Sequence, residues 1–190
     1  MRSFVFGKRT AAELLRDPLS LGFGLGFPAV LLLLLTLIQS NIPVPLFAPE
    51  QLVPGIAVFG LSFLCLFSAM LVARDRNTSF LFRLQASPMR AGDFILGYLW
   101  PQLPLALGQL LFCYAVGVLL GLPCSARILL SLLLQFPLAI FQLSLGLLLG
   151  CLLTERQAGS ICGALITNLS AWLSGAWFDL GLVGGGFERI

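Results

Sequence analysis

Charged side chains are confined to short segments of this chain, and long apolar stretches separate them. Five of these stretches carry no charge and are long enough for one membrane-spanning helix each, since a bilayer core takes about 20 apolar residues. Lipid also requires every backbone hydrogen bond to be made internally, which a helix does. The pattern therefore predicts an all-α integral membrane protein with five transmembrane helices in a single transmembrane domain of residues 1–190. The predicted spans are Leu19–Ile38, Leu52–Val72, Ile95–Leu120, Ile128–Leu152 and Ala158–Phe178.

The most polar segment, Arg74–Phe94, lies between the second and third predicted spans and carries four basic and two acidic residues. Asn77 or Thr78 can cap a helix that runs to Ala86, where Ser87 and Pro88 stop it. On that helix Arg76 and Arg83 lie on almost one line with Phe80 beside them. Arginines next to a phenylalanine suit either a lipid headgroup layer or an acidic, grooved protein surface, and composition leaves both open.

The N-terminal segment predicts a short amphipathic helix at the membrane interface. Thr10 and Glu13 fit a capping box at its start, and Pro18 disfavours helix at Asp17. The alternative is a charged flank that only anchors the first span.

Composition excludes a soluble domain, since 58% of residues are hydrophobic, 10% are charged and the mean hydropathy is +1.00. If the N-terminus is cytoplasmic and five spans alternate, nine basic residues face the cytoplasm and two, Arg127 and Arg189, face outward. This positive-inside bias predicts a cytoplasmic N-terminus and a cytoplasmic Arg74–Phe94 loop. It also explains the basic residues without a nucleic-acid partner.

Several function classes are disfavoured. The middle of each predicted span lacks charge, which argues against ion-coupled transporters and proton pumps. Histidine is absent from the sequence, which removes histidine-dependent membrane enzymes, and no phosphate-binding GxxxxGK[ST] loop occurs. The five cysteines lack metal-ligand spacing and are interpreted as apolar packing residues. We therefore expect no enzymatic activity, no metal and no cofactor.

Amide side chains are the main polar groups inside the spans. Gln102 and Gln109 are seven residues apart in the third span, as are Gln135 and Gln142 in the fourth, and Asn168 lies in the fifth. Such amides either hydrogen-bond across helix interfaces or line a translocation path. Glycine pairs at four-residue spacing predict close helix packing. These pairs are Gly22/Gly26, Gly117/Gly121, Gly146/Gly150 and Gly159/Gly163.

The order of these elements resembles the permease subunits of type-2 ATP-binding-cassette exporters. Three segments carry the resemblance: Glu13–Pro18 followed by an apolar span through Phe27-Pro28, Pro54-Gly55-Ile56 at the second span, and Arg74–Tyr98. The last has the Arg-acid-Arg start, the Leu-x-x-x-Pro stop and the glycine at the third span that recur in that family.

The resemblance implies a permease that moves a drug, lipid or lipid-linked glycan out of the cytoplasm, driven by a separate ATPase subunit. It implies a homodimer or heterodimer in the bacterial inner membrane, with the central loop docked on the ATPase as a coupling helix. The implied contacts are Arg74, Asp75, Arg76, Phe80, Leu81 and Arg83 in the loop and Glu13, Arg16 and Asp17 in the N-terminal helix.

Such permeases have a sixth span, whereas this sequence ends at Ile190, so the expectation is a truncated chain or a five-span form. From a different class, the alternative is a non-transporting membrane anchor or assembly protein. Its basic loop would bind anionic lipid or a partner.

Overall fold

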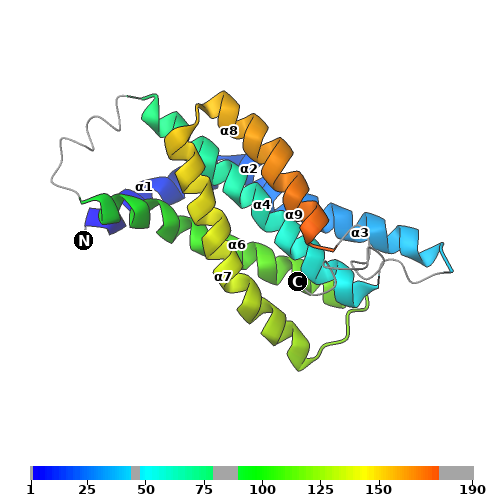
Figure 1. Ribbon diagram of the computed structural model, residues 1–190. Helices are drawn as coiled ribbons and strands as arrows, with labels where there is room; N and C mark the ends of the chain where they lie inside the picture. Colours follow the sequence, from blue (N-terminus) through cyan, green and yellow to red (C-terminus); the bar gives the residue numbers. More distant parts are fainter. Residues whose placement is uncertain (1, 44–47, 79–89, 176–190) are drawn as a thin grey trace, which may run out of the picture.

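The computed structural model describes residues 2–43, 48–78 and 90–175, and in these ranges every regular element is a helix. The all-α prediction is therefore confirmed. Figure 1 shows the long helices crossing one another, with α4 in their midst. The elements are α1 (Arg2–Arg16), α2 (Pro18–Leu21), the π-helix η1 (Gly22–Gly26), α3 (Phe27–Ser40), α4 (Pro49–Arg76), α6 (Ala91–Leu119), α7 (Ala126–Leu152), α8 (Glu155–Ile161), the π-helix η2 (Cys162–Ile166) and α9 (Thr167–Leu173).

Four helical segments of the described chain are long and apolar enough to cross a membrane: Gly22–Ser40, Pro49–Arg76, Ala91–Leu119 and Ala126–Leu152. They coincide with the first four predicted spans. The described part of the predicted fifth span lies in the helical run α8, η2 and α9, which is not among these four segments. The end of that predicted span, from residue 176 on, lies outside the described residues, so the count of five stays a prediction.

Helix α4 is the centre of the bundle, and it contacts α3, α6, α7, α8 and α9. It packs tightly against α7 at Gly146 and Gly150. A Cβ at Gly150 would lie 2.6 Å from the carbonyl oxygen of Ala69, and one at Gly146 would lie 2.9 Å from Ser68 Cβ. The predicted small-residue packing is thus present at this pair.

The remaining glycine pairs differ in their surroundings. Gly117 also packs tightly, because its Cβ would fall 2.6 Å from Val53 Cγ2. Gly22 and Gly26 have open space around them in the described structure, since no atom from outside their own helical turn lies within 4 Å of a Cβ built there. The packing interpretation therefore does not extend to that pair within this chain.

The predicted capping box at Thr10 is wrong, because α1 begins eight residues earlier, at Arg2. Thr10 is fully buried in mid-helix, and its hydroxyl donates to the Phe6 carbonyl at 3.3 Å. Phe6, Thr10 and Leu14 form a buried stripe at four-residue spacing, and α1 packs against α6. Tertiary packing thus extends the helix past the local start signal. The predicted break at Asp17 is confirmed, since α1 ends at Arg16 and α2 begins at Pro18.

Candidate functional site

The last turn of α4 brings three consecutive charged residues to the point where several helices meet. Successive residues of a helix point about 100° apart, so Arg74, Asp75 and Arg76 face different neighbours. Asp75 is buried at 5% exposure, whereas both arginines are exposed. The turn is closed by Thr78, whose hydroxyl donates to the Asp75 carbonyl at 2.8 Å.

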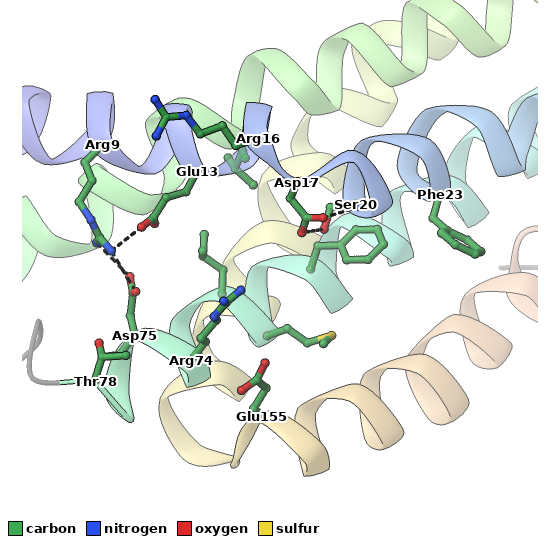
Figure 2. A pocket seen from close by; sticks show the side chains of 14 residues that line it. Arg9, Glu13, Arg16, Asp17, Ser20, Phe23, Arg74, Asp75, Thr78 and Glu155 are labelled. Carbon is green, nitrogen blue, oxygen red and sulfur yellow. Dashed lines mark hydrogen bonds and ion pairs between the residues drawn. The ribbon is translucent and has the colours of Figure 1, made fainter.

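The carboxylate of Asp75 is held by α1 and α6 together. Its Oδ2 accepts a hydrogen bond from the Tyr98 hydroxyl at 2.6 Å. The guanidinium of Arg9 approaches both carboxylate oxygens at 3.3 Å and also donates to Glu13 Oε1 at 2.5 Å (Figure 2). A buried carboxylate is tolerated only when it is paired in this way. Asp75 therefore joins three helices through one side chain.

Aromatic rings extend the junction between α1 and α6. The Phe6 ring stacks on Phe94 with centroids 5.7 Å apart and meets Tyr98 edge to face at 4.8 Å. Gly97 makes this possible, because a Cβ there would lie 2.8 Å from Phe6 Cε1 and closer still to Cδ1. Gly97, the glycine at the start of the third span that formed part of the family resemblance, is thus required here for the packing of the Phe6 ring.

Arg76 connects α4 to the end of α7. Its Nη1 donates to the carbonyl oxygens of Gly150 at 3.1 Å and Leu153 at 3.4 Å, and also to that of Cys151. These carbonyls lie at the C-terminus of α7, where the helix offers them no partners of its own. A cation there also complements the helix dipole. The guanidinium therefore caps α7.

A cavity of about 770 Å³ lies between α1, α2 and η1 on one side and α4 and α8 on the other (Figure 2). Its lining combines charged groups with an apolar part formed by Phe23, Phe67, Met70 and Leu71. The charged lining residues are Arg9, Glu13, Arg16, Asp17, Arg74, Asp75 and Glu155. Burial raises the pKa of the Glu13 carboxyl, and neighbouring Arg9 opposes that shift.

This cavity brings together five residues that the sequence assigned to two separate ATPase contacts: Glu13, Arg16, Asp17, Arg74 and Asp75. Their role as contacts stays a prediction. Phe80, Leu81 and Arg83 lie outside the described residues, as does most of the helix predicted up to Ala86.

Sequence reasoning missed Arg9, Tyr98 and Glu155 as members of the site. The four-residue spacing of Arg9 and Glu13 was an available signal for an ion pair. Tyr98 carries a hydroxyl near the start of an apolar span, and such a group needs a partner when it is buried.

Two of the predicted amides reach α4 from neighbouring helices. The Nε2 of Gln109 donates from α6 to the Ala57 carbonyl of α4 at 3.3 Å. The Nε2 of Gln135 on α7 lies 3.3 Å from the Pro54 carbonyl and 3.1 Å from the Tyr114 hydroxyl. Both glutamines are buried, and these contacts favour the packing interpretation over a translocation path.

The other amides are placed differently. Gln142 is buried and donates from α7 to Ser170 Oγ at 3.3 Å. Gln102 is also buried, but it donates to Tyr98 O within its own helix at 3.0 Å. Asn168 is exposed and bonds to its own helix, so the structure does not bring it together with the glutamines.

Comparison with known proteins gives one positive finding. A family model described as ABC-2 type transporter matches residues 3–186, nearly the whole chain. The comparisons with curated proteins and with solved structures return no match.

Proposed function

The chain belongs to the ABC-2 type transporter family, and on that premise we propose that it is the permease subunit of an ATP-driven exporter. As a member it is a multi-pass membrane component of an ABC transporter, and the family implies an ATP-binding cassette partner. In the proposal that partner is a separate subunit, which hydrolyses ATP and docks on residues 74–94.

The junction at the end of α4 is the observation that carries this proposal. Residues 79–89 follow directly after a turn whose Asp75 binds α1 and α6 and whose Arg76 caps α7. A displacement of that segment by a docked ATPase therefore acts on four helices at once. Differential contacts of this kind are what allow a partner to shift a membrane domain between two states.

The distribution of basic residues supports a cytoplasmic location for this junction. Arg9, Arg16, Arg74 and Arg76 all gather at one end of the bundle, as their shared cavity and contacts require. At the other end of α4, Arg127 lies 3.9 Å from Glu50, whose negative charge offsets its positive charge. We assign the basic end to the cytoplasm and the N-terminus with it, in the inner membrane of a bacterium.

The transported substrate in this proposal is hydrophobic or amphipathic, such as a drug, a lipid or a lipid-linked glycan. Away from their ends the spanning segments carry no charged residue, and the buried polar side chains there are amides and hydroxyls. Apolar side chains are also exposed along α3, α6 and α7. These faces suit contact with lipid and with a second permease subunit in a homodimer or heterodimer.

The test is association with the ATPase subunit encoded beside this gene, measured on the purified full-length permease. The double variant Phe80→Ala and Arg83→Gln removes predicted docking side chains and leaves Arg76 in place to cap α7. Docking anchors of this type are worth about 2 kcal/mol or more, so we expect the dissociation constant to rise at least about 30-fold. Arg127→Gln, at the opposite end of the bundle, is the matched control and should bind normally.

Unchanged association of the double variant would overturn the docking assignment. If the variant instead loses only its preference for vesicles that contain anionic lipid, the chain is the membrane anchor that composition also allowed.

A further inference from the structure

Helix α1 contacts both of the helices that residues 79–89 connect. On the preceding side, Arg9 binds Asp75 in the last turn of α4. On the following side, Phe6 packs against Phe94 and Tyr98 near the start of α6. One turn of α1 separates the two contacts, so a single short helix is fixed to both flanks of the segment.

The two flanks are also bonded to each other. The Tyr98 hydroxyl of α6 donates to the Asp75 carboxylate of α4 at 2.6 Å, a length typical of a strong hydrogen bond to a charged acceptor. The same carboxylate receives Arg9 from α1. We call Phe6, Arg9, Asp75 and Tyr98 the α1 clamp.

We propose that the α1 clamp makes α1 move together with the two flanks of residues 79–89 when the partner ATPase changes its nucleotide state. Arg9, Asp75 and Tyr98 are thus positioning residues for coupling. The proposal rests on the proposed function, because it needs an ATPase that acts on this segment.

The burial of Asp75 decides between a rigid and a breakable junction. Pulling α1 away would leave the carboxylate of Asp75 without Arg9 in a site that is only 5% exposed, and an unpaired buried charge is strongly unfavourable. Displacing α6 would break the bond from Tyr98. The least costly motion keeps all of these contacts and shifts the three helix ends as one body.

The space around α1 allows such a shift. The helix packs tightly on α6, where Gly97 admits the Phe6 ring, but the cavity of about 770 Å³ separates it from α8. Movement of α1 relative to α8 therefore changes the shape of this cavity without breaking packed contacts across it. The cavity bounds the moving unit only where α1 faces α8, because the end of α4 is itself packed against α8.

Hydrogen–deuterium exchange on the assembled permease–ATPase complex tests this inference, with ATP plus vanadate compared against no nucleotide. The variants are Tyr98→Phe, which removes one hydroxyl, and Arg9→Gln. Lys8→Gln is the matched control, because it removes an exposed charge from the adjacent position of α1. Arg9→Lys tests rescue by a retained positive charge.

In the unaltered complex we expect nucleotide-dependent exchange changes in residues 2–16 and in both flanks. In Tyr98→Phe and Arg9→Gln the change in residues 2–16 should fall at least threefold while the change in the flanks persists. Lys8→Gln should match the unaltered complex, and Arg9→Lys should restore part of the response. A merely structural role would alter exchange equally with and without nucleotide.

Two results overturn the clamp while the proposed function stands. In one, the flanks respond to nucleotide and α1 does not. In the other, α1 responds undiminished in both Tyr98→Phe and Arg9→Gln. A different result rejects the proposed function and the clamp with it: the chain forms no complex with the ATPase, or neither the flanks nor α1 respond to nucleotide.

Discussion

Replacing Gly97 by alanine should destabilise the permease through one steric contact. The added Cβ would lie 2.8 Å from Cε1 and 3.0 Å from Cγ of Phe6, well inside ordinary van der Waals separation. The ring has little freedom to retreat, because Phe94 and Tyr98 contact it at centroid distances of 5.7 and 4.8 Å. Forcing extra volume into such packing costs about 1–3 kcal/mol.

Gly108→Ala provides the matched control for this effect. It makes the same substitution in the same helix, at a position where nothing lies within 4 Å of the new Cβ. Alanine is a better helix former than glycine by about 1 kcal/mol, so the control should be neutral or slightly stabilising. The difference between the two variants isolates the clash from the change in helix propensity.

The assay is thermal unfolding of the isolated permease in detergent, which needs neither substrate nor ATPase. For a chain of this size each kcal/mol corresponds to about 2–4 °C in Tm, so Gly97→Ala should melt at least a few degrees below Gly108→Ala. Phe6→Leu should recover part of the loss when it is combined with Gly97→Ala, because the smaller side chain leaves room for the Cβ. Equal melting of the two glycine variants, or a strictly additive double variant, would refute the packing argument.

The remaining predictions use the same unfolding measurement, and the last one adds a transport assay. Arg76→Gln should lower the free energy of unfolding by about 1–3 kcal/mol, because it leaves carbonyls at the end of α7 without their charged donor. The exposed control Arg127→Gln should cost less than about 1 kcal/mol. Equal losses in the two variants would show that the capping contacts contribute nothing to stability. Gly150→Leu should prevent α4 and α7 from packing, since even its Cβ would lie 2.6 Å from the Ala69 backbone oxygen, and a normally folded variant would contradict that geometry. Gln109→Leu should lower the free energy of unfolding by about 0.6–1.7 kcal/mol, the range for interhelical hydrogen bonds in membranes, and should leave ATPase-driven transport intact. Lost transport at unchanged stability would instead favour a role of Gln109 in a translocation path.

The long helices were predictable from the sequence because lipid leaves the backbone few alternatives. Charge-free runs locate the spans, and the structure extends α4 at both ends and α6 at its start by a few residues. The start of α1 was not predictable in this way. The capping signal at Thr10 depends only on neighbouring residues. The helix instead begins earlier because α1, with Phe6 and Leu14 buried, packs against α6, which is distant in sequence.

The polar segment was recognisable from the sequence, but its internal contacts were not. Arg74, Asp75 and Arg76 read alike as a charged stretch, although one is buried, one caps α7 and one lines a cavity. Only the positions of the surrounding helices distinguish them. Gly97 shows the same limit, because its importance depends on Phe6, which lies far away in sequence.

The junction also determines which residues report on docking to the ATPase. Asp75 and Arg76 hold helices together, so replacing either would weaken the bundle as well as any contact that it makes in the proposed docking. Arg74 differs, because it is exposed and lines the cavity, and its charge acts on a described residue, Glu13, only through space, where it opposes the rise that burial causes in the pKa of that carboxyl. Its replacement by glutamine should therefore leave the melting temperature of the isolated permease unchanged. A loss of ATPase association in that variant would then measure docking alone, and a lower Tm would show that Arg74 belongs to the junction as well.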